Sequence, residues 1–511
     1  MKKSTDLSTA FQKYLGLLAA GLAFVVYLLT LAPGVYGFDS AELSTGVHLL
    51  GIVHPSGYPL YLIVGKLFSY LPIKDLAYRL NIMSAFFGAL TVYMLFIVIH
   101  LVIDNPFFAA IASLFLAFSN YFWQMALIAE VYTLHTFLLS VNLLLLFMWQ
   151  KSGSVKYLYG FAFIYGLSLS NHTSGVLFAP AFTWLVITSN HWHWDKAFKR
   201  ILIMGGSCVI GMLPYIYLPI RAMTHPSLNY VLEYYGEDLT TFAGVWWMIS
   251  GKAYRFFAFA YTWREIPGEM LRFFNYFWRN FMGIGVLIGC LGLVVGWQRD
   301  KKFIVGLIGV FLANAIFFIN YRVLDKDTMF LPSYMIWAIF IGLGLFWLWN
   351  QVVKWVNTGL LAEKTKKYYA FFLPLVIVMM IGLNWKWVNL SDVKGPASFA
   401  DEVMRTAEPN AVILAQWSPA VILEYTQLVN NQRSDLLIYN RSRSQVAQFY
   451  LLWKKGWARE SIWRAIEEHE LDIVRSEISH RPVYVVDYDP LFAREFEYLP
   501  EGNYFQLAPI E

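Results

Sequence analysis

Long apolar runs limit what this chain can fold into more than any other feature of its sequence. A transmembrane helix needs about 20 mostly apolar residues. The runs that reach or approach this length are 14–32, 80–103, 107–120, 125–149, 157–171, 174–190, 200–219, 280–298, 303–320, 331–350 and 369–388. Hydrophobic residues make up 58% of the chain and charged residues 14%, against about 25% charged in an ordinary soluble domain. A soluble core cannot enclose so much apolar surface, so we predict an α-helical polytopic membrane protein with about eleven transmembrane helices.

The positive charges of the short loops predict the orientation of these helices, because cytoplasmic loops carry an excess of Lys and Arg. With the N-terminus inside, the cytoplasmic loops contain Lys151, Lys156, Lys196, Lys199, Arg200, Arg299, Lys301, Lys302, Lys354, Lys364, Lys366 and Lys367. We therefore expect a protein of the cell (inner) membrane with a cytoplasmic N-terminus, a first outer loop at 33–79 and a large outer loop at 221–279. Within the first loop, the apolar run 58–71 is too short to span and predicts a helix lying in the membrane interface.

The composition changes after about residue 390, where charged residues return at the density of a soluble protein. Short strand-like runs at 411–416, 435–440 and 482–487 alternate with helical patterns at about 398–407, 419–430, 443–455 and 459–470. Alternating strands and helices predict a small α/β domain. We expect two domains, a membrane domain at 1–390 and a soluble extracytoplasmic domain at 391–511.

The first outer loop contains two carboxylates that could carry acid–base chemistry. Asp39 lies just beyond the first apolar run, and Glu42 follows it by three residues. In a helix starting here the two side chains share one face, where they could act as a general base and its tuning partner. The same spacing is also typical of a helix cap, with Asp39 at the N-cap and Glu42 in the first turn. The two roles are compatible.

Further polar groups fall at the same predicted membrane face, each with a structural alternative. His54 and Tyr58 occupy an interfacial turn, where a His more often serves a structural hydrogen bond. Glu130 lies at the edge of an apolar run, where it could contact Arg79, His172 or a substrate, or hold two helices together by a hydrogen bond. Arg221 suits a phosphate, or could extend to the lipid headgroups. The other two outer mouths carry Asn171-His172-Thr173 and Asp325-Lys326-Asp327. Their shared face points to a substrate site more strongly than any one of them.

Several classes of function are disfavoured. The sequence lacks a phosphate-binding Gly loop, a dinucleotide fingerprint, zinc-ligand spacing and a nucleophile elbow. The net charge of +5 is spread along the loops, so no nucleic-acid partner is expected. No cofactor and no metal ligands are predicted, although dependence on a divalent metal is left open. A lipid or polyprenyl-glycan transporter would be expected to have internal repeats and helices broken at the midplane. The sequence pattern indicates neither. A non-catalytic envelope assembly protein would leave the polar first loop unexplained.

Around the polar residues of the predicted outer face, the sequence resembles the transmembrane protein 260-like family. The motifs that carry the resemblance are Asp39-Ser40-x-Glu42, His54-Pro55-Ser56-Gly57-Tyr58-Pro59-Leu60-Tyr61, Tyr78-Arg79-Leu80-Asn81, Ala129-Glu130-Val131-Tyr132-Thr133-Leu134, Asn171-His172, Leu213-Pro214-Tyr215, Leu218-Pro219-Ile220-Arg221 and the segment from Asp325 to Pro332. They cover about residues 30–350. The chain departs from the family's usual form where Phe38 and Ala41 replace Gly and where Ser56 replaces Pro.

The resemblance implies a GT-C-like fold and a glycosyltransferase activity. Members of this superfamily take a sugar from a polyprenyl-phosphate carrier, and the vertebrate proteins of this family are O-mannosyltransferases. Carried over by motif, the catalytic role falls on Asp39, with Glu42 beside it. Substrate contacts would then come from His54, Tyr58, Arg79, Glu130, His172, Arg221 and Asp325. We expect an inverting enzyme with a mannose-like sugar, an acceptor hydroxyl of a protein, lipid or glycan, and membrane lipids as partners.

Overall fold

The computed structural model describes residues 3–323, 326–356 and 362–510. The chain folds into two compact units, each built from three separate stretches of sequence. The helical unit contains residues 1–31, 82–215 and 257–391. The sheet-containing unit contains residues 32–81, 216–256 and 392–511. Asp325 lies outside the described residues.

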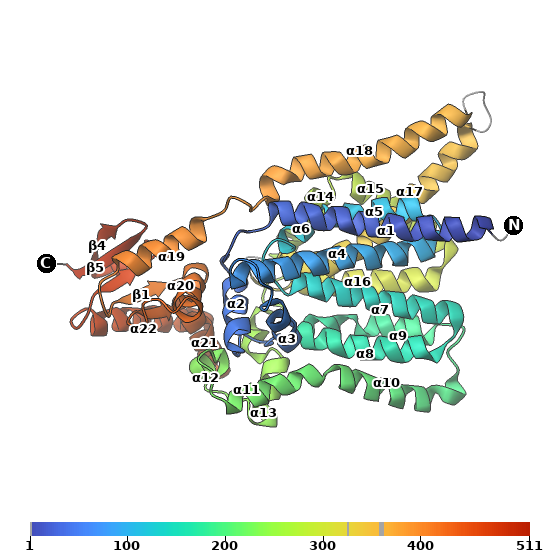
Figure 1. Ribbon diagram of the computed structural model, residues 1–511. Helices are drawn as coiled ribbons and strands as arrows, with labels where there is room; N and C mark the ends of the chain where they lie inside the picture. The colour runs from blue at the N-terminus through green and yellow to red at the C-terminus, as the bar shows by residue number, and fades with distance from the viewer. Residues whose placement is uncertain (1–2, 324–325, 357–361, 511) are drawn as a thin grey trace. The chain divides into compact units, whose positions relative to one another are not determined.

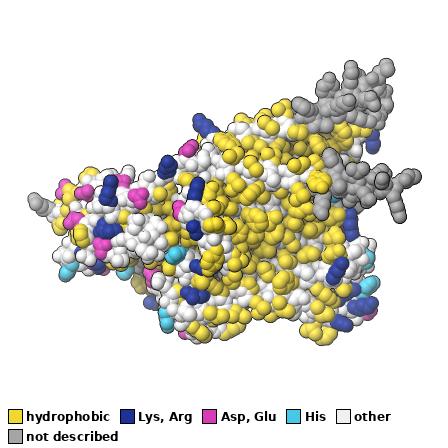
Figure 2. Space-filling view, in the orientation of Figure 1, with side chains coloured by type: hydrophobic (Ala, Val, Ile, Leu, Met, Phe, Trp, Pro, Cys, Tyr) yellow, Lys and Arg dark blue, Asp and Glu magenta, His cyan; other side chains and the backbone are white. Residues whose placement is uncertain are grey.

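The helical unit is a bundle whose long helices run alongside one another (Figure 1). Its helices are α1 (Lys3–Thr30), most of α4 (Leu76–Ile103), α5 (Pro106–Ala117), α6 (Asn120–Met125), α7 (Tyr132–Ser152), α8 (Val155–Asn171), α9 (Ala179–Ile187), α10 (Ala197–Gly211), α14 (Ile266–Asn280), α15 (Ile284–Arg299), α16 (Lys301–Ile319), α17 (Leu331–Val356) and α18 (Ala362–Val388). Figure 2 shows hydrophobic side chains over most of the visible face of this bundle. Exposed Leu18 and Val25 on α1, and Leu287 on α15, belong to this apolar surface.

The predicted membrane character is confirmed, while the number of spans stays a prediction. Among the described residues, four helices are long and apolar enough to cross a membrane: Leu76–Ile103, Tyr132–Ser152, Lys301–Ile319 and Thr328–Lys354. The number rises to six if the bent pairs Trp194–Gly211 with Leu213–Met223 and Ile266–Asn280 with Ile284–Arg299 each form one span. Shorter apolar helices accompany them at Tyr14–Thr30, Pro59–Phe68, Pro106–Ala117, Thr173–Ile187 and Leu373–Val388. The chain is therefore a mostly helical, multi-pass integral membrane protein.

The prediction of one continuous helix over 125–149 is wrong at its start. α6 ends at Met125 and α7 begins at Tyr132. Tertiary contacts satisfy the backbone in this break: the Glu130 amide donates to Ser84 Oγ at 3.2 Å, and Asn171 Nδ2 donates to the Val131 carbonyl at 3.2 Å. Because these side chains replace the helical hydrogen bonds that the break loses, an apolar run alone could not reveal it.

The sheet-containing unit joins short helices to a five-stranded mixed sheet (Figure 1). The short helices are α2 (Asp39–Leu49), α3 (Pro59–Phe68), α11 (Tyr217–Met223), α12 (Tyr230–Tyr235) and α13 (Phe242–Ile249). The sheet segment contains α19 (Gly395–Thr406), β1 (Val412–Ala415), α20 (Trp417–Val429), β2 (Leu437–Asn440), α21 (Arg441–Lys454), α22 (Arg459–Glu477), β3 (Val483–Val485), β4 (Phe496–Glu501) and β5 (Tyr504–Pro509). The interfacial helix predicted at 58–71 corresponds to α3.

The strand order is β2-β1-β3-β5-β4. β1 pairs in parallel with β2 and β3, so that Val412 faces both Leu437 and Val483, and β5 pairs antiparallel with β3 and β4. All four residues of β1 are buried, as a central strand requires. The strands predicted at 411–416, 435–440 and 482–487 correspond to β1, β2 and β3, and the β4–β5 hairpin was missed. Gly502 and Asn503 at its turn were the available signal.

Candidate active site

The start of α2 brings Asp39 and Glu42 to one side of the helix, as their spacing predicts. Asp39 is the first residue of α2, and its side chain is 33% exposed, whereas the Glu42 side chain is fully buried. The N-cap position belongs to Phe38, whose side chain makes no capping bond. The alternative that Asp39 is the N-cap is therefore wrong. Because the Glu42 carboxylate is buried, it needs a hydrogen-bonding or oppositely charged partner.

His54 supplies that partner and links the two carboxylates. Its Nδ1 contacts Glu42 Oε2 at close range, and its backbone amide donates to Glu42 Oε1 at 3.1 Å. The other ring nitrogen, Nε2, lies 2.9 Å from the Tyr58 hydroxyl and 3.6 Å from Asp39 Oδ2. The predicted pair of Asp39 and Glu42 thus forms one cluster with His54 and Tyr58.

The charges in this cluster settle which form of His54 is favoured. Burial alone lowers the pKa of His54, but the carboxylates of Glu42 and Asp39 outweigh burial and raise it to about 9. Burial likewise favours the neutral form of Glu42. Its contacts with His54 and with Arg443 nevertheless keep the Glu42 pKa below its ordinary value. At neutral pH the cluster therefore contains an imidazolium beside an ionised Glu42.

The C-terminal segment contributes two residues to the cluster that sequence reasoning missed. Trp417 Nε1 donates to Asp39 Oδ1 at 3.0 Å. Arg443 places Nη2 3.5 Å from Glu42 Oε1 and Nη1 2.8 Å from Glu424 Oε1. Trp417 and Arg443 follow β1 and β2 directly, at the carboxyl ends of adjacent parallel strands, where such sheets commonly bind ligands. That edge was the signal that could have found them.

Close packing between α2 and α20 holds the Trp417 side chain against the Asp39 carboxylate. The backbone amide of Phe38 donates to Ser418 Oγ at 3.3 Å. A Cβ added at Gly37 would lie 2.0 Å from Ser418 Oγ, so a side chain there would require the Ser418 hydroxyl to move. Tyr425, two turns further along α20, accepts a hydrogen bond from the Ala77 amide at 3.3 Å. The loop before α2 and the start of α4 are thus both attached to α20.

Arg79 and Arg221, both predicted to contact the substrate, bind backbone carbonyls. Arg79 donates through Nε, Nη1 and Nη2 to the carbonyls of Ile73, Ser69 and Lys74 at 2.7, 2.7 and 2.8 Å. Arg221 donates through Nε and Nη2 to the carbonyls of Leu50 and Leu49 at 2.6 and 3.2 Å. These bonds hold the ends of α2 and α3. A contact with substrate stays a prediction for both.

Glu130 and His172 belong to the helical unit. Glu130 is buried in the break before α7. His172 accepts through Nδ1 from the backbone amide of Ser174 at 3.3 Å, and the same nitrogen lies 2.7 Å from Ser174 Oγ. Its ring centre lies 5.2 Å from that of His135 and 5.8 Å from that of Tyr132. The hydrogen bond from Asn171 to the Val131 carbonyl ties the two segments together.

A metal site is not apparent in the part of the chain that the structure describes. No group of three or more His, Cys, Asp and Glu side chains there could hold a metal ion. In the candidate active site both ring nitrogens of His54 already have partners, Glu42 on one side and Tyr58 on the other.

Comparison with known proteins supports the family resemblance. Residues 39–195 match the family described as the Protein O-mannosyl-transferase TMEM260 N-terminal domain. The resemblance to the TMEM260 family is thereby confirmed. Protein O-mannosyl-transferase tmem260 of Dictyostelium discoideum is 24% identical over 74% of this chain and 50% of its own length. The TMEM260 protein of Mus musculus is 29% identical over 39% of this chain and 29% of its own length. The chain spans about half the length, or less, of the curated relatives it matches.

Solved structures confirm the type of fold. ArnT from Cupriavidus metallidurans, in a crystal structure with undecaprenyl phosphate, matches with a TM-score of 0.53 and 13% identity. The match covers 97% of this chain and 98% of ArnT. The apo form of ArnT matches with a TM-score of 0.52 over 97% of each chain. The chain has an ArnT-like membrane fold.

The TMEM260 match divides the candidate residues into two groups. Those within residues 39–195 are Asp39, Glu42, His54, Tyr58, Arg79, Glu130 and His172. Arg221, Asp325, Trp417, Glu424 and Arg443 lie outside it. The cluster around Asp39 therefore combines residues of the segment that matches the TMEM260 model with residues of the C-terminal segment.

Proposed function

We propose that this protein is a membrane glycosyltransferase of the GT-C type. It moves a sugar, with mannose favoured, from a polyprenyl-phosphate carrier to an acceptor hydroxyl on the outer face of the membrane. The TMEM260 match and the ArnT-like fold support the class of reaction. The observation that carries the proposal is the partly exposed Asp39 carboxylate, held by Trp417 and backed by the buried pair of His54 and Glu42.

Asp39 suits the role of general base better than its neighbours. Glu42 is fully buried, so an acceptor hydroxyl cannot reach it. The pKa of His54, raised to about 9, means that its ring already carries a proton at neutral pH and cannot accept another. Asp39 keeps an exposed edge while the Trp417 N–H fixes its direction. A base must meet its proton at hydrogen-bond distance, and Asp39 is the carboxylate that offers this.

The proposed reaction is a single displacement at the anomeric carbon. Asp39 takes the proton of the acceptor hydroxyl as the oxygen attacks that carbon. The bond from the anomeric carbon to the phosphate oxygen breaks, and its electron pair leaves with the lipid phosphate. The configuration of the sugar is inverted. Arg221 and Arg79 are the proposed phosphate contacts. A guanidinium has five N–H donors, so the backbone bonds described above leave donors on each arginine.

A hydrocarbon-lined cavity in the helical unit is consistent with a polyprenyl carrier. It has a volume of about 330 Å³ and lies among α8, α9 and α10, with Phe161, Phe182, Ile201 and Met204 in its lining. An isoprenoid chain could enter such a space sideways from the bilayer. We propose Glu130, His172 and Asp325 as further contacts for the sugar or the acceptor.

The loop charges support the proposed orientation. We propose about eleven spans, a cytoplasmic N-terminus, and placement in the inner membrane. We also propose that residues 1–390 form the transferase domain and that residues 391–511 form an extracytoplasmic domain. The large outer loop at 221–279 would then lie on the same side as the first outer loop.

Sugar transfer from defined donors tests the proposal. The full chain in nanodiscs would receive radiolabelled polyprenyl-phosphate mannose, or the glucose and arabinose analogues, with a crude membrane fraction as the acceptor source. Heat-inactivated protein is the control. We expect transfer of label, with mannose preferred and with an anomeric configuration opposite to that of the donor. No transfer from any donor would contradict the proposed function, and retained configuration would contradict the single displacement.

A further inference from the structure

Burial of the Arg443 side chain costs free energy unless neighbouring groups compensate its positive charge. Arg443 lies in the first turn of α21, where the Asn440 side chain caps the helix by accepting from the Arg443 amide at 3.2 Å. A positive charge at a helix N-terminus is disfavoured by the helix dipole. The Arg443 side chain is also only 2% exposed. A buried cation at this end of a helix requires strong compensation.

Two carboxylates and three aromatic rings provide that compensation. Glu424 binds Nη1 at 2.8 Å, and Glu42 lies 3.5 Å from Nη2. The guanidinium carbon lies 5.1 Å from the ring centre of Trp417, 5.3 Å from that of Tyr230 and 5.9 Å from that of Tyr234. Aromatic faces attract a cation at this range. Arg443 is thus fixed on one side by α20 and faces Glu42 on the other.

We propose that Arg443 is a positioning residue of the candidate active site, which holds the Glu42 carboxylate ionised and aimed at His54. His54 in turn stands beside Asp39, so the C-terminal segment completes a cluster that begins in the first outer loop. The inference rests on the proposed function only where it calls this cluster catalytic.

The charges around Glu42 allow the effect of Arg443 to be measured as a change in pKa. The titratable and charged groups that face this region are Asp39 on α2, His54 and Tyr58 before α3, Tyr230, Glu233 and Tyr234 on α12, Tyr254, Glu424 on α20 and Arg443 itself. Arg443 lowers the pKa of Glu42, and it also opposes the proton of His54. Removal of this cation should therefore raise the pKa of both groups.

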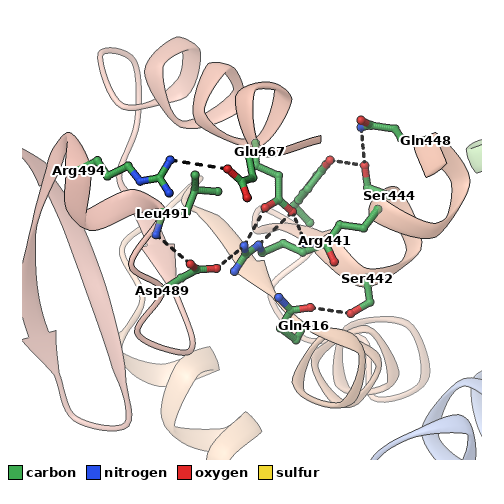
Figure 3. Close-up of polar contacts among 12 residues, drawn as sticks. Gln416, Arg441, Ser442, Ser444, Gln448, Glu467, Asp489, Leu491 and Arg494 are labelled. Carbon is green, nitrogen blue, oxygen red and sulfur yellow. Dashed lines mark hydrogen bonds and ion pairs between the residues drawn. The ribbon is translucent and has the colours of Figure 1, made fainter. Parts of the chain in front are cut away.

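Arg441 provides a matched control from the same turn of α21. It is also buried, and its Nη2 lies 2.7 Å from Glu470 Oε2 and 2.6 Å from Asp489 Oδ2 (Figure 3). Its partners lie on α22 and in the loop after β3, and Glu42 is not among them. Loss of Arg441 should cost stability as loss of Arg443 does, without changing the charge that His54 experiences.

The experiment is an NMR titration of His54 in the full chain in nanodiscs, with histidine labelled at Cε1 and the signal assigned by its loss in His54→Gln. We expect Arg443→Met to raise the midpoint from about 9 by roughly one pH unit, because the positive charge of Arg443 opposes the proton of His54. Arg441→Met should leave the midpoint unchanged. An unchanged midpoint in Arg443→Met, or an equal rise in Arg441→Met, would overturn the proposal.

Glu424→Gln gives a second reading if Arg443→Met does not fold. The pKa of Glu424 is raised to about 7 by burial, against the pull of Arg443, so this group is ionised near pH 9. The amide keeps the shape and removes the charge. With Arg443 no longer compensated from that side, we expect His54 to titrate at lower pH, and no movement would overturn the proposal. The titration needs no turnover, so an inactive wild type would count against the proposed function alone.

Discussion

At the scale of single residues, the candidate active site depends on a histidine placed between two carboxylates. Glu42 is buried and holds Nδ1 of His54, while Asp39 stays partly exposed near Nε2. This division gives two chemically similar side chains different roles. The buried carboxylate orients and charges the ring, and the exposed one is left to meet substrate.

The raised pKa of His54 predicts a pH-dependent contribution to stability. A His with a folded pKa of about 9 and an ordinary pKa of 6.5 contributes fully below pH 6.5, and the contribution is lost as the pH rises through 9. Its upper size is roughly 3 kcal/mol, from 1.36 kcal/mol per pH unit. The stability difference between wild type and His54→Gln, from thermal unfolding in nanodiscs at pH 6 to 10, should shrink over this range. A difference that stays constant would contradict the charged state assigned to His54.

At the scale of elements, the start of α2 depends on an unusual backbone. Phe38 has φ 57° and ψ −146°, a conformation that glycine adopts far more readily than other residues. The family's usual residue at this position is Gly, so the departure noted in the sequence introduces strain. A Cβ at Gly37 before it would displace the Ser418 hydroxyl, which lies 2.0 Å from that position. The approach of α20 to α2 therefore constrains both positions.

Removing the strain at Phe38 should stabilise the protein. The Phe38 side chain is 52% exposed, so little packing is lost on its removal. We expect Phe38→Gly to be more stable than Phe38→Ala by about 1 kcal/mol, because alanine keeps the Cβ that opposes this backbone. Thermal unfolding of both variants in the same detergent would measure this. Equal stability of the two would show that residue 38 carries no backbone strain.

At the scale of the whole molecule, the features that could be predicted from the sequence are those that depend on local sequence pattern. Apart from the break before α7, the predicted apolar runs fall mainly on helices, and β1, β2 and β3 lie at the three strand-like runs. Asp39, Glu42 and His54 share one short stretch, so a motif could identify them together. Trp417 and Arg443 lie almost 400 residues further on. Their contacts depend on the parallel pairing of β1 with β2 and on the docking of α20, which no local pattern encodes.

The central claim is that Asp39 removes the acceptor proton, and single-turnover transfer measures this step directly. Wild type and Asp39→Asn would be compared at saturating lipid-linked mannose, with donor binding and folding checked in both. The amide preserves the bond from Trp417 but cannot take a proton. We expect a rate about 10²- to 10⁴-fold lower in the variant, with donor binding unchanged. A folded, donor-binding Asp39→Asn protein that transfers sugar at the wild-type rate would contradict the account.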